Sequence, residues 1–518
     1  MEMLLIFPTP SLGATGSVYF SRYNFTVILH SNRFFSLLLY LIEFKIRIMR
    51  FKQTVFFLFF PFLALIATNP VDNFVQNPLL ENANISLLVK DLKTNETLYQ
   101  YRPTNLVTPA STMKLVTTAT ILELFGPDFR FETRLEIDGT ISKDSTLNGN
   151  LYIRGGGDPT LGSEKLGEKD FLPRWVQAIK LAGINKISGR IVADETIFED
   201  QVLNPKWTWE DIGNYYAPGI HGISYMDNTY RMVFRSGAIG TTPEILRVEP
   251  EIPGLEVDNH LKSTSTDHDK AYFYGAPYSL DRSVYGEIPA NKAEFTVKGD
   301  IPNPALLLAR HFHNRLTQSE VQIADFAVVR TIPANSKLIY KYYSPALKDI
   351  ITETNVKSNN HFAEYLFKFI STKNNPIGST NASISAIRKH WKALGLPIDQ
   401  LNQYDGCGLS PCDAVSATFF GDLLTFMRTK SPYSEYFYKS LPVSGGRGTL
   451  STLLLNTALE GKVHAKSGTI ENVKCYAGYI ELQDRTLVFS IMVNHPNGNT
   501  HEVVKAMEKF LLEITANP

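Results

Sequence analysis

Cysteine is scarce in this chain of 518 residues, which contains only Cys407, Cys412 and Cys475. Three cysteines are too few for a disulfide framework, and their spacing is not that of a structural zinc site. We therefore expect no metal ion and no cofactor. Cys407 and Cys412 could pair in an oxidising compartment, but a small buried thiol is the preferred interpretation for each cysteine.

An excess of charge of either sign is also absent. Lysine and arginine together number 51, and aspartate and glutamate together number 51 as well. This balance provides no overall field that would attract nucleic acid or an anionic membrane, so we expect no nucleic-acid partner. The length predicts two to four domains with a large buried core, but it does not indicate a function.

The first 70 residues contain an apolar run over 54–67, which follows a short basic opening at Met49. This pattern is typical of a secretory signal, and roughly 14 apolar residues are fewer than the roughly 20 that a membrane-spanning helix needs. We predict a signal peptide at 49–67 and export to the periplasm or cell envelope, with a retained membrane anchor as the alternative. Residues 1–48 are interpreted as an over-extended reading of the gene; the alternative is a second apolar, partly buried segment around 34–42.

Local patterns divide the remainder of the chain into three parts. The alternating segment 85–91, a polar turn and the segment 98–102 predict a β-hairpin. The next segment predicts a helix that Thr108 caps and that ends at Gly126. Closely spaced turn residues over 131–335 then indicate a strand-rich block.

The last third of the chain predicts helices at 344–370 and 417–427. Later segments predict three strands and a closing helix, at 462–465, 476–482, 487–494 and 501–514. Strands at both ends that flank a central helical group predict one sheet built from the two ends of the chain. We therefore expect 75–130 and 336–518 to form one α/β domain, with 131–335 as a β-rich insertion of two nested subdomains.

Ser111 and Lys114 form the only Ser-x-x-Lys in the chain. Residues three apart share one face of a helix, so the amine of Lys114 can reach the hydroxyl of Ser111 and take its proton. A lysine pKa of about 10.4 makes the amine a poor base at neutral pH, so it must be desolvated or lie beside another cation. Taken alone, this motif is weak evidence for catalysis.

A second motif, Ser-x-Asn, is formed by Ser358 and Asn360 at the start of a predicted helix. Its ordinary interpretation is a helix N-cap. Ser379 begins another Ser-x-Asn. We prefer Ser358 because an apolar-faced helix follows it, whereas the Gly- and Asn-rich surroundings of Ser379 indicate a loop.

A third motif stands at the end of a predicted strand and consists of Lys466, Ser467, Gly468 and Thr469. It supplies a cation, two hydroxyls and a glycine that lets a substrate backbone come close, so it can bind a terminal carboxylate. On its own it is an ordinary strand end. The order of the three motifs along one chain is what favours a serine hydrolase.

With these motifs in view, the chain resembles the penicillin-binding proteins of the D-alanyl-D-alanine carboxypeptidase and endopeptidase type, in the low-molecular-mass group with a large insertion after the first motif. The resemblance runs from about Ile85 to Ile514 and includes further stretches at 109–115, 149–161, 405–410 and 441–450. It implies a β-lactamase/transpeptidase-like α/β (α+β) fold, in which helices flank an antiparallel sheet.

The resemblance also implies a role for each motif. Ser111 would be acylated by the substrate carbonyl with Lys114 as the base. Ser358 would pass a proton to the leaving amine, and Asn360 would hold the substrate amide. In the third motif, which includes Gly468, Lys466 would supply positive charge near Ser358. The hydroxyls of Ser467 and Thr469 would bind the terminal carboxylate, and the N–H of Thr469 would form part of an oxyanion hole.

The substrates that the resemblance implies are peptidoglycan peptides, and β-lactam antibiotics would be covalent inhibitors. The chain departs from the family pattern in two places: the third motif reads Lys-Ser-Gly rather than Lys-Thr-Gly, and Cys407 stands where serine is usual. Two other functions stay open, a β-lactamase and a catalytically inactive cell-wall-binding protein.

Overall fold

The computed structural model describes residues 69–329 and 335–516, together with 16–19, 26–29 and four positions at 40, 42, 43 and 45. The chain divides into two compact units, 1–69 and 70–518. In the first unit, two short strands pair antiparallel, β1 (Gly16–Tyr19) and β2 (Thr26–Leu29). The predicted signal peptide at 49–67 lies outside the described residues, as does most of the segment 1–48.

Five antiparallel strands of the second unit form a sheet in the order β21-β22-β23-β3-β4. The strands are β3 (Asn84–Asp91), β4 (Thr97–Tyr101), β21 (Val463–Ile470), β22 (Val473–Glu481) and β23 (Thr486–Asn494). The pair β3 and β4 confirms the predicted hairpin, and β3 also pairs with β23 from the other end of the chain. Helices α2 (Pro70–Val75) and α11 (Thr500–Ala516) pack on one face of this sheet, and α9 (Ala417–Thr429) packs on the other.

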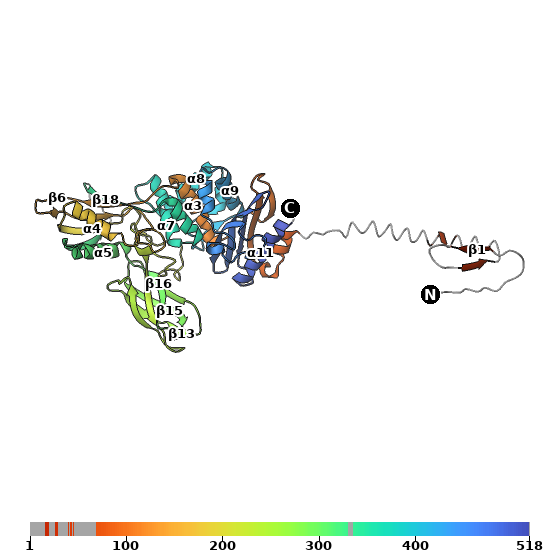
Figure 1. Ribbon diagram of the computed structural model, residues 1–518, viewed down its shortest axis with the longest axis horizontal. Coiled ribbons are helices and arrows are strands. Elements are labelled where there is room, and N and C mark those ends of the chain that lie inside the picture. Colours follow the sequence, from red (N-terminus) through yellow and green to blue (C-terminus); the bar gives the residue numbers. More distant parts are fainter. Residues whose placement is uncertain are drawn as a thin grey trace. The chain divides into compact units, whose positions relative to one another are not determined.

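A group of helices lies beside this sheet (Figure 1). Its members, besides α9, are α3 (Lys114–Phe125), α6 (Leu347–Val356), α7 (Asn360–Ile370), α8 (Thr380–Ala393) and α10 (Ser434–Lys439). Residues 114–122 of α3 are all buried, since both α6 and α7 contact this helix. Two of its three threonines, Thr118 and Thr120, donate within the helix to the carbonyls of Lys114 and Val116, each at 2.7 Å, whereas Thr117 donates to the carbonyl of Gly406.

Two predicted helix boundaries are wrong. Thr108 is not a cap, because its N–H and its carbonyl bond to the side chain of Asn494 at 2.7 and 3.0 Å. A 3₁₀ turn, η2 (Ala110–Met113), precedes α3 instead. The predicted helical segment 344–370 is two helices, since Ser358 has a φ of 56°, which a continuous right-handed helix does not allow.

A mixed seven-stranded sheet has the order β18-β5-β8-β9-β7-β6, with β17 also paired to β9. Its strands are β5 (Glu132–Ile137), β6 (Thr140–Ile141), β7 (Thr146–Asn148), β8 (Leu151–Arg154), β9 (Lys186–Asp194), β17 (Gln322–Val329) and β18 (Lys337–Tyr343). Helices α4 (Leu172–Leu181) and α5 (Pro304–Gln318) share its core, so the block predicted as strand-rich also contains helices. Because β18 pairs with β5, this sheet continues past the predicted limit at residue 335.

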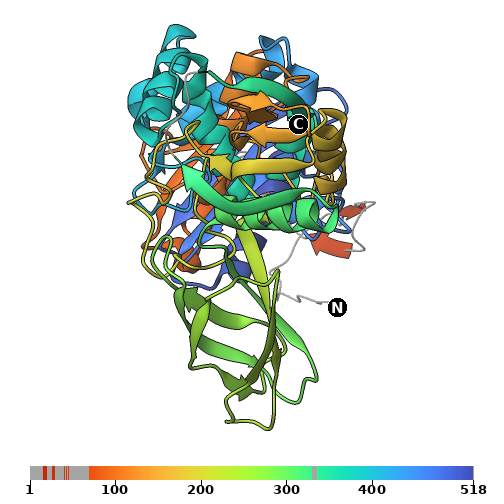
Figure 2. The same ribbon diagram turned by 90° about the vertical axis from the view of Figure 1, so that its left-hand side faces the viewer.

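Two smaller sheets lie between β9 and α5 in the sequence. One pairs β10 (Thr229–Arg235) with β11 (Glu244–Glu249) and β16 (Phe295–Asp300). The other contains β12 (Glu256–Asn259), β13 (Lys262–Thr264), β14 (Lys270–Tyr274) and β15 (Asp281–Pro289). Figure 2 shows the second of these as a lobe that projects from the rest of residues 70–516. Two further short strands pair antiparallel, β19 (Leu401–Asn402) and β20 (Ala414–Val415).

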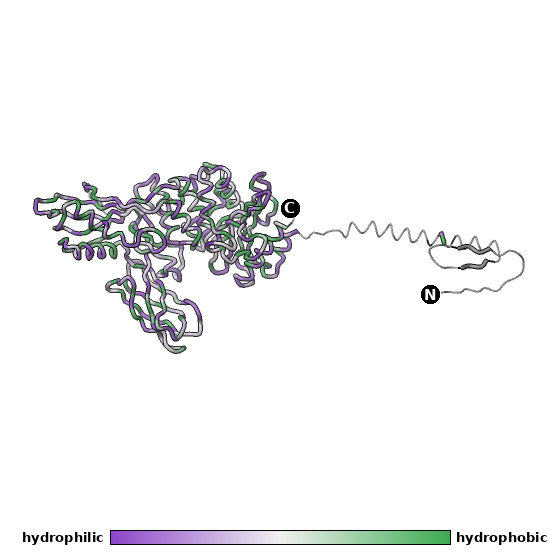
Figure 3. The backbone as a smooth tube through the Cα atoms, viewed as in Figure 1, coloured by the Kyte–Doolittle hydropathy of each residue, from purple (hydrophilic) through white to green (hydrophobic). Residues whose placement is uncertain are grey.

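Hydrophobic and hydrophilic residues interleave along residues 70–329 and 335–516 (Figure 3). Among the residues that the structure describes, no helix is both long and apolar enough to cross a membrane.

Candidate active site

The first motif lies on the turn that leads into α3. Ser111 is in η2 and is partly exposed, whereas Lys114 is the first residue of α3 and is fully buried. Ala110, immediately before Ser111, has a φ of 46°, a left-handed conformation that is strained for a residue with a side chain. Such strain persists only where the surrounding structure holds the backbone in place.

Two glycines allow that support. A Cβ atom at position 468 would lie 2.5 Å from the carbonyl oxygen of Pro109, and one at position 408 would lie 1.9 Å from that of Ala110. Strand β21 and the loop at 405–410 therefore press against the Ser111 turn. The missing side chain of Gly468 makes room for the turn that carries the serine. The expected close approach of a substrate backbone at Gly468 stays a prediction.

The amine of Lys114 joins the first motif to the second. Its Nζ donates to Ser111 Oγ at 2.8 Å, to Asn360 Oδ1 at 2.7 Å and to the carbonyl of Cys407 at 2.7 Å. Burial lowers the pKa of Lys114 below its ordinary value, although the nearby Asp405 and Glu364 oppose that shift. The arrangement places a desolvated amine against the hydroxyl of a partly exposed serine.

The second and third motifs also meet. Ser358 lies in the turn between α6 and α7, and its Oγ accepts a hydrogen bond from Lys466 Nζ at 2.9 Å. Burial, with the positive charges of Lys114 and Lys474, holds the pKa of Lys466 well below its usual range. The side chain that caps α7 is that of Asn359, which accepts from the N–H of Phe362, so Ser358 is free of the capping role.

Two expectations about these motifs are wrong. Ser379 is not in a loop, because its hydroxyl caps α8 by accepting from the N–H of Ala382 at 3.3 Å. The third motif does not end a strand: Lys466 to Thr469 lie inside β21, which continues to Ile470 at the edge of the five-stranded sheet.

The hydroxyls of the third motif have partners that the sequence did not indicate. Ser467 Oγ donates to Thr449 Oγ1 at 2.8 Å, and Thr469 Oγ1 accepts from Lys474 Nζ at 2.8 Å. Lys474 lies opposite Thr469 on the neighbouring strand β22. The only sequence signal for Thr449 was its place in one of the stretches similar to the family, at 441–450.

Asp405 holds the loop that contacts Lys114, and sequence reasoning gave it no role. Its carboxylate accepts hydrogen bonds, at 2.6 to 3.1 Å, from five donors. They are the N–H groups of Cys407, Gly408, Leu409 and Ser410 and the indole of Trp207. This network fixes the position of the Cys407 carbonyl, which accepts from Lys114.

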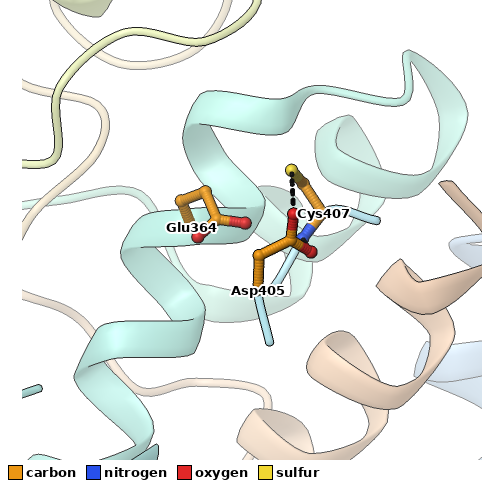
Figure 4. Close-up of side chains that lie close together, drawn as sticks. All are labelled: Glu364, Asp405 and Cys407. Atoms are coloured by element: carbon orange, nitrogen blue, oxygen red, sulfur yellow. Dashed lines mark hydrogen bonds between the residues drawn. The ribbon is translucent and has the colours of Figure 1, made fainter. Parts of the chain in front are cut away.

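Glu364, Asp405 and Cys407 bring donor atoms within 4.8 Å of one another (Figure 4). Their chemistry does not favour a metal ion. Both oxygens of Asp405 already accept N–H donors, and burial raises the pKa of Glu364 to about 8 and that of the Cys407 thiol well above its usual range. Metal ligands must be deprotonated, so this cluster is suited to holding its own loop.

The three cysteines are free thiols, so Cys407 and Cys412 do not form the pair that was considered. Cys407 and Cys475 are buried as expected, but Cys412 is exposed. Cys407, at the position where serine is usual in the similar family, packs against Trp207 and Ala363.

Comparison with known proteins assigns the chain to a family. Residues 67–514 match the D-Ala-D-Ala carboxypeptidase 3 (S13) family. The chain belongs to this family. It is therefore a serine peptidase of the hydrolase class and a D-Ala-D-Ala carboxypeptidase.

Relatives of this S13 peptidase match it over most of their length. A D-alanyl-D-alanine carboxypeptidase from Actinomadura sp. strain R39 is 28% identical over 443 residues, covering 83% of this chain and 81% of that protein. The carboxypeptidase DacB of Haemophilus influenzae is 23% identical over 415 residues, covering 78% of this chain and 83% of that protein. A crystal structure of penicillin binding protein 4 from Haemophilus influenzae has a TM-score of 0.75 at 21% identity, covering 86% of this chain and 99% of that one. This likeness confirms the predicted fold class.

Proposed function

We propose that this S13 peptidase hydrolyses D-alanyl-D-alanine bonds both in peptidoglycan stem peptides and in their cross-links, through an acyl-enzyme on Ser111. The observation that carries the proposal is the 2.8 Å contact between Ser111 Oγ and the buried amine of Lys114. A serine hydroxyl is a weak nucleophile until an adjacent base takes its proton, and this amine is the base within reach.

In the proposed acylation, Ser111 Oγ attacks the carbonyl carbon of the penultimate D-alanine while the neutral amine of Lys114 takes the hydroxyl proton. The N–H groups of Ser111 and Thr469 would stabilise the oxyanion. The C–N bond then breaks, and the proton that Lys114 took passes through Ser358, which contacts Lys466, to the leaving amine, so that Lys114 is neutral again. Water attacks the ester, releasing the acid and restoring the Ser111 hydroxyl.

The third motif is proposed to bind the substrate's terminal carboxylate. Ser467 and Thr469 offer hydroxyls at the edge of the sheet. Lys474 Nζ donates to the Thr469 hydroxyl, and Lys466 Nζ donates to the backbone carbonyl of Ser467. Asn360 would hold the substrate amide, since its Nδ2 is already oriented by the carbonyl of Tyr216 at 2.9 Å. In a cross-link the leaving group is a peptide side chain instead of free D-alanine, and the same residues would serve both reactions.

Labelled penicillin tests this proposal. We expect a long-lived covalent adduct that maps to Ser111 and disappears in Ser111→Ala, together with loss of D-alanine release. The structure of the Haemophilus influenzae protein complexed with a β-lactam supports the choice of probe. Rapid release of the hydrolysed drug would instead identify a β-lactamase, and equal D-alanine release by wild type and Ser111→Ala would exclude the serine mechanism.

The two proposed substrates are separated by digestion of purified, cross-linked peptidoglycan. Loss of cross-linked dimers would show endopeptidase action, and release of free D-alanine would show carboxypeptidase action.

The substrate occurs in the bacterial envelope, so we also propose that the protein is exported. The division into a catalytic domain (75–130 and 336–518) and an insertion (131–335) stays a proposal. The pairing of β18 with β5 supports an insertion that extends toward residue 343.

Acylation should become faster as pH rises. Only the neutral amine of Lys114 can accept the Ser111 proton, and burial lowers the pKa of this lysine below the ordinary 10.5. The neutral fraction therefore increases with pH and becomes substantial at a lower pH than for an exposed lysine. Rates of penicillin acylation from about pH 5 to about pH 10 would check this. A rate that decreases throughout that range would contradict a lysine base.

A further inference from the structure

The four-stranded sheet β12–β15 has one buried face and one exposed face. Successive side chains of a strand point to opposite faces, so along β14 Phe273 is fully buried while Tyr272 is 39% exposed and Tyr274 shares its face. On β15, Val284 is buried and Tyr285 is 46% exposed. Tyr285 lies directly opposite Tyr272 in the strand pairing, so the exposed face gathers tyrosine rings.

Aromatic rings continue beyond these two strands in an unbroken row. Trp209, which is 62% exposed, stacks on Tyr274 with ring centroids 6.3 Å apart and an interplanar angle of 24°. The ring centroids of Tyr274 and Tyr285 lie 5.9 Å apart. His260 stacks on Tyr285 with ring centroids 4.5 Å apart and an interplanar angle of 12°. We refer to Trp209, Tyr274, Tyr285 and His260 as the ring row.

The polar neighbours of the ring row indicate what it can bind. Lys270 and Glu287 pair at 3.9 Å on the same face, Asp258 bonds to His260 at 2.7 Å, and Ser283 lies opposite Tyr274. Protein interfaces are depleted in lysine, glutamate and aspartate at their core. Single-stranded nucleic acid also stacks on aromatic rings, but it requires a positively charged groove, whereas Asp258 and Glu287 are acidic. Rings among mixed polar groups suit an uncharged polyhydroxylated ligand.

The ring row is tied to the active site by one segment of chain, 209–216. Its Asn214 accepts from the N–H of Phe273 at 2.9 Å and donates to the carbonyl of that residue at 3.2 Å, between the two tyrosines of β14. Two residues later, the carbonyl of Tyr216 orients Asn360 of the second motif. A ligand on the ring row would therefore be held at a fixed position relative to the catalytic groups.

We propose that the ring row binds the glycan of peptidoglycan, a chain of N-acetylated sugars, while an attached peptide enters the site at Ser111. A sugar ring presents an apolar C–H face and a polar edge, which match the faces of the aromatic rings and the hydroxyl, carboxylate and ammonium groups beside them. This inference rests on the proposed function, because the glycan is the polymer that carries the peptides that the enzyme is proposed to cut.

Binding of the full chain to two probes tests the proposal: purified peptidoglycan sacculi and a soluble oligomer of N-acetylglucosamine. Trp209→Ala and Tyr285→Ala should each bind both probes about tenfold more weakly, the scale of one aromatic stacking contact. Both variants should release D-alanine from a short D-Ala-D-Ala peptide, and should form the penicillin adduct, at wild-type rates. Tyr343→Ala is the matched control, since this tyrosine is 51% exposed on β18, outside the ring row.

Several outcomes would overturn the glycan site. The first is that Trp209→Ala and Tyr285→Ala bind both probes as wild type does, and the second is that Tyr343→Ala loses as much binding as they do. The third is that the two variants lose short-peptide hydrolysis as much as binding. The fourth is that the wild-type protein binds sacculi but does not bind the sugar oligomer. Failure of the proposed function gives a different result. If the wild-type protein releases no D-alanine but binds the oligomer through Trp209, the glycan site is supported and the peptidase function is excluded.

Discussion

Lys114→Met should slow the acylation of Ser111 by about 10³-fold, within the range for loss of a general base. Methionine has a similar length and fills the buried space, but it cannot accept a proton. Lys114→Arg should be equally inactive, because a guanidinium stays protonated and so cannot act as a base. The measurement is the rate of labelling by penicillin, compared with the rate of D-alanine release from a short peptide.

Lys90→Met is the matched control. Lys90 is also buried, on β3, where it pairs with Asp422 at 3.0 Å. Its loss should lower the stability of the protein and leave the acylation rate of the folded fraction unchanged. Acylation of Lys114→Met or Lys114→Arg within a few-fold of wild type would show that another group accepts the Ser111 proton.

The first motif could be predicted from sequence because its geometry is local. Ser111 and Lys114 are three residues apart, and the turn between them brings hydroxyl and amine together. The other two bonds of Lys114 join residues 246 and 293 positions away, Asn360 and Cys407. Local periodicity carries no information about such contacts. The order of the motifs indicated only that Lys114 meets Asn360, and no motif indicated the contact with Cys407.

Tertiary contacts explain the expectations that were wrong. Thr108 has the side chain of a helix cap, but Asn494 from β23 takes both of its backbone groups. The strand-rich pattern ended near residue 335, but β18 adds to the same sheet by pairing with β5, some 200 positions earlier. The left-handed backbone at Ala110 and Ser358 has no sequence signal, because glycine is the residue that ordinarily indicates it.

Asp405→Asn should slow acylation about 100-fold, because a small displacement of a catalytic group has an effect of this size. The carboxylate accepts hydrogen bonds from five N–H donors, whereas the single oxygen of an amide accepts fewer and its NH₂ group would face N–H donors. The loop would shift and move the Cys407 carbonyl away from Lys114. Trp207→Phe, which removes one of the five N–H donors, should slow acylation about tenfold or less.

The pH profile separates positioning of Lys114 from general damage. The negative charge of Asp405 raises the pKa of Lys114, so Asp405→Asn should shift the rise in acylation rate to lower pH as well as reducing the rate. Asp138→Asn is the control, since that carboxylate also accepts from several donors, in Asn150 and Tyr152, but in the turn between β5 and β6. It should destabilise the protein without moving the profile. A reduced rate with an unshifted profile in Asp405→Asn would limit Asp405 to a structural role, because loss of its charge must otherwise lower the pKa of the base.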